Sequence, residues 1–202
     1  MTTFEEDVVE CYYNLKGYLT VKNVCFSAVE KRPGGKGRGE IDLLAVLIGE
    51  KRKIKDAVHI EVAVSLTSQF PFISRRNRNY DEVWRLLKKF FMSDADEKIK
   101  EYFKSSKWRS QLISSDFDPE KAVSKLSRRL KELGAEHEIL TSEADKIEVR
   151  IRFNDKEKQI EIIPFSKILS ELKEIFQEQN LSEKSFQDPR LRGIQYLAKY
   201  LK

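Results

Sequence analysis

Residues 39–65 decide the fold of this chain. They begin with G-E-I-D-L-L-A-V at residues 39–46 and end with H-I-E-V-A-V-S at residues 59–65. Both ends are rich in Val, Ile and Leu and have the length of a strand, while the polar, basic segment between them predicts a hairpin loop. Because side chains alternate across a strand, Asp42 and Glu61 are expected on one face of this hairpin. Two carboxylates among apolar neighbours are costly unless a cation neutralises them.

The expected pairing of the two strands favours a metal site. With the loop centred near residues 52–53, position 42 faces position 63, and Glu61 is a diagonal neighbour of Asp42, about 7–8 Å away. Such a pair is within reach of one cation, and carboxylate oxygens suit Mg²⁺ or Mn²⁺. The alternative is that both carboxylates belong to an edge strand and face water. His59 shares the face of Glu61, either as an ordinary residue of the sheet or as a proton carrier near the metal.

These residues resemble a known family of nucleases. The PD-(D/E)XK pattern has a helix glutamate, then G-x-x-D on one strand and E-x-K on the next. Residues 38–46, R-G-E-I-D-L-L-A-V, and residues 60–65, I-E-V-A-V-S, are similar to the two strand motifs. The first helix, F-E-E-D-V-V-E-C-Y-Y-N-L-K-G-Y at residues 4–18, places Glu6 where archaeal Holliday-junction resolvases carry their helix glutamate.

The resemblance implies a metal-dependent DNA endonuclease or resolvase-like phosphodiesterase. Asp42 and Glu61 would bind Mg²⁺ or Mn²⁺, with Glu6 contributing through water. Resolvases of this type act as dimers on four-way junctions, so the resemblance also implies DNA, including branched DNA, as a partner and a homodimer as the assembly.

The chain departs from the family pattern at one position. The lysine of E-x-K is replaced by Ala63. In the family this lysine helps to activate or orient the attacking water, and here its role would pass to Lys36 or His59. The alternative is a catalytically impaired nuclease-fold protein that binds nucleic acid or acts as an interaction subunit.

Charge and composition agree with a polyanionic partner. The chain has 38 Lys and Arg against 33 Asp and Glu, a formal net charge of +5. Two basic segments flank the carboxylate strands and are expected either to contact phosphates or to form solvated loops. The candidate nucleic-acid-binding residues are Lys31, Arg32, Lys36, Arg38, Arg75, Arg76 and Arg78. The two cysteines have no metal-binding spacing, which favours a reducing cytoplasm, and no apolar run has the length of a membrane span.

Hydrophobic periodicity predicts an α/β protein. The resemblance implies a restriction-endonuclease-like core at residues 1–142, with the order α-β-β-β-α-β and a mixed sheet flanked by helices. An α+β extension at residues 143–202 is expected to contain a second hairpin and further helices, and it would cover the sheet, form a dimer surface or bind a partner. Residues 81–91 predict an amphipathic helix whose aromatic side chains pack in the core. Strands joined through helices are expected to be parallel.

Overall fold

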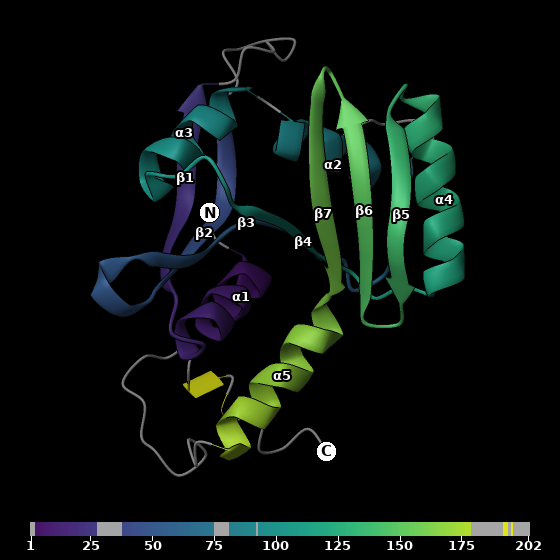
Figure 1. Cartoon of the computed structure of the whole chain (residues 1–202). Helices are drawn as coiled ribbons and strands as arrows, with labels where there is room; N and C mark the ends of the chain where they lie inside the picture. The colour runs from purple at the N-terminus through teal and green to yellow at the C-terminus, as the bar shows by residue number, and fades with distance from the viewer. Residues whose placement is uncertain are drawn as a thin grey trace.

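The computed structural model has one mixed β-sheet at its centre. It describes residues 3–27, 38–74, 81–91, 93–178, 192–193 and 195. The strands are β1 (Leu19–Ser27), β2 (Arg38–Ile48), β3 (Ile54–Ala63), β4 (Arg109–Ser114), β5 (Glu136–Glu143), β6 (Lys146–Phe153) and β7 (Lys156–Pro164). They form one seven-stranded sheet in the order β1-β2-β3-β4-β7-β6-β5 (Figure 1). The α/β class and the mixed sheet predicted from the sequence are confirmed.

The middle of the sheet is parallel and its two sides are antiparallel. β1, β2 and β3 pair in antiparallel fashion, as do β5, β6 and β7. β4 pairs in parallel with β3 on one side and with β7 on the other. The expected parallel pairing of strands joined through helices therefore holds for β3 and β4. The predicted division at residue 142 falls within β5, which belongs to the same sheet as the other six strands.

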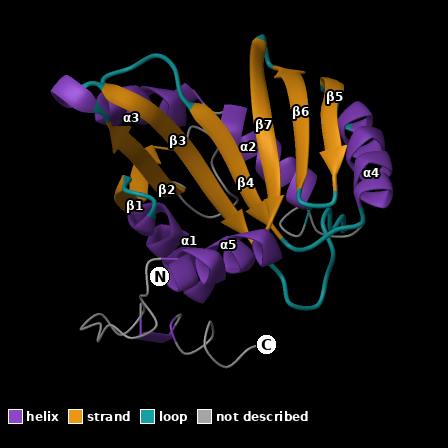
Figure 2. Cartoon of the chain, turned by 60° about the horizontal axis from the view of Figure 1, so that its bottom comes forward, coloured by secondary structure: helices purple, strands orange, loops and turns teal. Residues whose placement is uncertain are grey.

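Helices cover both faces of the sheet. Their bounds are α1 (Phe4–Leu15), α2 (Glu82–Phe91), α3 (Ser93–Phe103), α4 (Pro119–Glu132) and α5 (Phe165–Glu178). α1 and α5 lie side by side on one face, where their apolar residues pack against β2 and β3 (Figure 2). α2 and α4 pack against β4, β6 and β7, and α3 packs against β1 and β2. Apolar cores on both faces thus bury β3 and β4, the strands nearest the predicted site.

The predicted register of the β2–β3 hairpin is wrong by two residues. Leu43 pairs with Ile60, and continuing this register aligns Asp42 with Glu61 rather than with Ala63. The turn contains a short 3₁₀ segment with Lys51 and Arg52 at positive φ, and a bulge follows Leu47, which moves the turn toward β2. A shift of two residues preserves the face of every side chain, so Asp42 and Glu61 still share a face.

No helix in the described part of the chain combines the length and the apolar character needed to cross a membrane.

Candidate functional site

Asp42 and Glu61 converge on one cation, which is a lysine of the protein. The Nζ atom of Lys89, on α2, lies 3.1 Å from Oδ1 of Asp42 and 2.7 Å from Oε2 of Glu61. The same ammonium group donates a hydrogen bond to the backbone carbonyl of Glu40. We call Asp42, Glu61 and Lys89 the carboxylate cluster. The shared face predicted for the two carboxylates is confirmed, and the cluster holds two negative charges against one positive charge.

The sheet fixes both carboxylates in place. The backbone N–H of Val62 donates to Oδ2 of Asp42 over 2.8 Å, which links β3 to the side chain of β2. Nε2 of His59 lies 2.8 Å from Oε1 of Glu61, because the two side chains are two residues apart on one strand face. His59 is fully buried and Glu61 is 3 % exposed. Each carboxylate therefore has a protein partner on one oxygen and Lys89 on the other.

His59 is neutral in this environment. Burial, together with the charges of Lys158 and Lys89, lowers the pKa of His59 to about 3. The Nδ1 atom is buried without a hydrogen-bond partner among the described residues. A neutral ring with its proton on Nε2 donates to Glu61 and leaves the lone pair on Nδ1, which is the tautomer that this geometry favours. His59 thus positions Glu61, and its neutrality argues against a role as a proton carrier.

Burial opposes the negative charges of the cluster. Burial, and then the charge of Glu61, raise the pKa of Asp42 to about 6. Burial likewise raises the pKa of Glu61. Burial alone would lower the pKa of Lys89, but the two carboxylates outweigh it and the pKa is raised. Lys89 therefore stays charged near neutral pH, and an additional cation would stabilise the ionised forms of Asp42 and Glu61.

Sequence reasoning missed Lys89 because it lies on a helix. The aromatic residues of α2 predicted the helix and its core face, and no role was predicted for its lysines. Glu82, Arg85 and Lys89 are spaced by three and four residues, which places them on one helix face. All three line the space beside Asp42 and Glu61. This polar stripe was the signal in the sequence that a side chain of the helix could reach the carboxylates. The absence of the motif lysine at Ala63 was the reason to search for another lysine.

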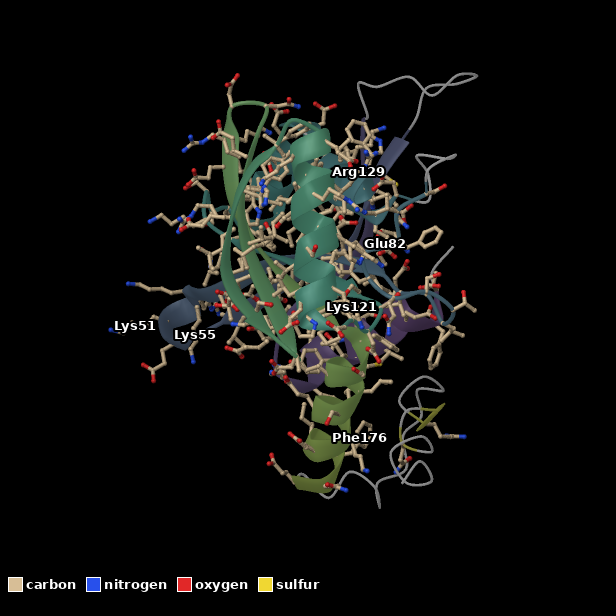
Figure 3. All side chains as sticks on the ribbon, turned by 90° about the vertical axis from the view of Figure 1, so that its right-hand side faces the viewer. Lys51, Lys55, Glu82, Lys121, Arg129 and Phe176 are labelled. Carbon is tan, nitrogen blue, oxygen red and sulfur yellow. The ribbon has the colours of Figure 1, made fainter. Side chains whose placement is uncertain are left out.

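The start of α2 is anchored by buried charges. The carboxylate of Asp81 accepts a hydrogen bond from the backbone N–H of Trp84 over 3.0 Å, as in a helix cap. Arg129 of α4 forms an ion pair with Asp81 at 2.8 Å (Figure 3, where Arg129 and Glu82 are labelled). These contacts fix the position and the direction of α2, and so the place where Lys89 meets the sheet.

An open cleft lies beside the carboxylate cluster. Its volume is about 500 Å³, and its lining includes Asp42, Glu6, Glu82, Arg85 and Phe72. Burial raises the pKa of Glu82 to about 7, although its Oε2 accepts a hydrogen bond from the Phe72 N–H over 2.7 Å. Glu82 therefore titrates near neutral pH in the same cleft as Asp42, which no sequence pattern indicated.

Glu6 has a structural part and faces the same cleft. It forms a capping box with Thr3 at the start of α1, with reciprocal hydrogen bonds of 3.2 and 3.3 Å. Burial raises the pKa of Glu6, and the charges of Asp42 and Glu40 add to this shift. Glu6 therefore stabilises the start of α1, and its carboxylate also contributes negative charge to the cleft.

The predicted basic residues lie mostly outside the described residues. This holds for Lys31, Arg32, Lys36, Arg75, Arg76 and Arg78. Arg38 is the first residue of β2, the strand that carries Asp42. The turn between β2 and β3, with Lys51 in it and Lys55 at the start of β3, projects away from the body of the molecule (Figure 3).

Known proteins give no further indication of function. No protein-family model matches the chain, and neither a curated protein nor a solved structure is found to be similar to it. Within the described ranges, no three His, Cys, Asp or Glu side chains are grouped closely enough to hold a metal ion. The chemistry of the site must therefore be argued from the carboxylate cluster and its cleft alone.

Proposed function

We propose that this chain is a Mg²⁺- or Mn²⁺-dependent endonuclease that hydrolyses phosphodiester bonds of DNA. The proposal keeps the restriction-endonuclease-like core and the resolvase-like activity that the sequence resemblance implies. One observation carries it: the ammonium group of Lys89 lies between Asp42 and Glu61, beside the cleft. We propose that Lys89 replaces the motif lysine that is absent at position 63.

The donor atoms of the site fit a divalent cation. Mg²⁺ is usually held in enzymes by one or two carboxylates, with water and substrate phosphate oxygens completing its coordination. Asp42 and Glu61 supply two carboxylates with one negative charge in excess of Lys89. A bound divalent cation would lower the pKa of a coordinated water and stabilise charge on the phosphate.

The side chains of the protein would divide the remaining tasks. Lys89 is attached through a flexible four-carbon chain, and its charge suits it to stabilise a phosphate oxygen once the carboxylates are neutralised. Its raised pKa makes it a poor general base. Glu82, with a pKa of about 7 in the same cleft, is matched to accept a proton from water near neutral pH. His59 and the N–H of Val62 would hold the two carboxylates in position.

One observation favours the alternative, a nuclease-fold protein that binds nucleic acid or acts as an interaction subunit without cleavage. Lys89 already forms a short ion pair with each carboxylate of the cluster. Such a cluster can also be a stable structural element, and position 63 carries only a methyl group.

The decisive experiment is cleavage of supercoiled plasmid and of a synthetic four-way junction, with Mg²⁺ and with chelator. The Asp42→Asn, Glu61→Gln and Lys89→Ala variants should each lose about 10²-fold or more of the rate, because each removes a charge that acts on the transition state. Lys88→Ala is the matched control, since Lys88 lies over the ring of Trp84 at 5.4 Å instead of in the cluster. Cleavage that survives chelator, or that all three variants retain, would reject the proposal; DNA binding without cleavage would support the alternative.

A further inference from the structure

A second cleft lies at the other end of the parallel strands. β4 and β7 pair only from Ser110 and Ile160 onward, and toward their amino ends the two strands diverge (Figure 2). The space between them and α3 has a volume of about 660 Å³. This volume is in the range of sites for small ligands. We call it the basic cleft, after the five cations of its lining: Lys100, Lys107, Arg109, Lys156 and Lys158.

The carboxylates of the basic cleft do not balance its cations. Asp96 lies 2.7 Å from Nζ of Lys156 and 2.5 Å from Nζ of Lys158, so one carboxylate serves two ammonium groups. The other two carboxylates of the lining are Glu157 and Glu161, and both are also paired with arginines. The cleft therefore carries an excess of positive charge before any ligand is considered.

Two further lysines, Lys100 and Lys107, line the cleft. In the part of the chain that the structure describes, the ammonium groups of Lys100 and Lys107 have no ion pair, and both side chains are exposed. Burial lowers the pKa of Lys158, and the nearby charges of Lys156 and Lys100 add to this effect. The lysines thus repel one another, and an anion between them would relieve this repulsion.

Arg109 contributes less than the lysines. Its guanidinium group is held by Asp56 at 2.5 Å and by Glu161 at 3.2 Å. Lys158 is held as well, over the ring of Trp108 at 5.4 Å. The groups free to turn toward a ligand are the long, exposed side chains of Lys100 and Lys107, while Lys156 and Lys158 provide a preorganised positive wall.

We propose that the basic cleft binds a phosphate group. A compact, doubly charged anion matches four lysines, of which only Lys156 and Lys158 share a carboxylate. Ammonium groups bind phosphate as point charges. The phosphate has two chemical sources, a small phosphorylated molecule or the backbone of a nucleic-acid strand. The proposal does not depend on nuclease activity, because the basic cleft contains no residue of the carboxylate cluster.

The test is calorimetric titration of the full-length protein at low ionic strength with inorganic phosphate and, separately, with a 12-nucleotide single strand. The double variant Lys100→Ala/Lys107→Ala should weaken phosphate binding about tenfold, since two charge-assisted hydrogen bonds are lost. The control, Lys125→Ala/Lys131→Ala, removes two exposed lysines of α4 that do not line the cleft. Its phosphate affinity should stay within about twofold of the wild type. If the control loses as much, or if wild type does not bind phosphate, the proposal is rejected.

Two further measurements make the test sharper. Asp96→Asn removes the carboxylate that competes for Lys156 and Lys158, so phosphate should bind severalfold more tightly; weaker binding by the folded variant would count against the proposal. Phosphate should shift the indole N–H resonance of Trp108, which lines the cleft, and leave that of Trp84 in place. Oligonucleotide binding that falls in parallel, and that phosphate displaces, identifies a nucleic-acid strand as the source; unchanged oligonucleotide binding identifies a small phosphorylated molecule.

Discussion

The carboxylate cluster and the basic cleft contain the same chemical groups in opposite proportions. In the cluster, the carboxylates of Asp42 and Glu61 share the ammonium group of Lys89. In the basic cleft, the ammonium groups of Lys156 and Lys158 share the carboxylate of Asp96. Both groups are partly buried, so neither excess charge is well solvated.

The pKa shifts of the two groups mirror each other. Burial and the neighbouring carboxylate raise the pKa of Asp42 to about 6, whereas burial and neighbouring lysines lower the pKa of Lys158. In each case the group in excess is shifted toward its neutral form. An ion of opposite sign would reverse either shift, which is why the first site suits a divalent cation and the second a phosphate.

The largest effect is expected from removing the only cation of the carboxylate cluster. Lys89→Met should destabilise the protein by about 3–5 kcal/mol at pH 8, because two buried carboxylates lose their partner. The penalty should shrink at pH 5, since Asp42, whose pKa is raised to about 6, then takes up a proton in the folded state. Urea unfolding at both pH values measures it, with Lys88→Met as the control. Equal penalties at the two pH values would show that the charges are not what the lysine stabilises.

A smaller effect is expected from the mirror-image change in the basic cleft. Asp96→Asn should destabilise the protein by about 2 kcal/mol at pH 7, because Lys156 and Lys158 lose a carboxylate that is less buried than Glu61. The measurement is urea unfolding beside Glu97→Gln, an exposed neighbour on α3. Adding phosphate should recover part of the loss. If Asp96→Asn is as stable as the wild type in the absence of phosphate, the basic cleft does not mirror the carboxylate cluster.

Glu82 adds a third carboxylate near the cluster, and its charge should oppose folding. Its pKa is raised from 4.5 to about 7, so the folded state binds the proton more tightly than the unfolded state. Stability from this group is therefore present below pH 4.5 and lost as the pH rises through 7. Glu82→Gln, which keeps the bond from the Phe72 N–H, should be more stable than wild type by roughly 1–2 kcal/mol at pH 8, and no more stable at pH 4. Thermal unfolding at the two pH values decides this.

The smallest expected signal is the absence of a titration at His59. Because its pKa is lowered to about 3, the ring should remain neutral from pH 8 down to pH 4 in the folded protein. Heteronuclear NMR of the imidazole nitrogens measures this directly, with the urea-unfolded chain, in which histidine titrates near pH 6.5, as the reference. A midpoint between pH 6 and 7 in the folded state would mean that burial and the charges of Lys158 and Lys89 do not lower the pKa of His59 as described.

Local patterns were sufficient to predict the strands and the shared face of the carboxylates. The two-residue period places Asp42 and Glu61 on the same face of the hairpin even when the register is wrong by two. The shared face was therefore predicted correctly although the turn was not. The turn itself depends on a left-handed backbone conformation, with positive φ, at Lys51 and Arg52. Neither lysine nor arginine favours this conformation, so the sequence did not predict it.

Contacts between distant segments were beyond sequence patterns. Lys88 and Lys89 are adjacent and identical. The helical period places them on different faces of α2, but which face meets Glu61 depends on how α2 lies across the sheet. The basic cleft depends on β7 lying beside β4 rather than in a separate hairpin. The hairpin pattern of residues 146–163 predicted the two strands but carried no information about their neighbour.

The position of β4 has a consequence for synthesis of the chain. One edge of β4 is completed by β3, but the other waits for β7, and residues that become neighbours there, such as Gln111 and Glu161, are fifty positions apart. At ribosomal rates of 5–20 residues per second, the open edge is exposed for roughly 3–10 seconds. During this time the nascent chain presents a strand edge with unpaired backbone groups, which is a site for aggregation or chaperone binding. Folding of this protein is therefore expected to be completed only after residue 164 has left the ribosome.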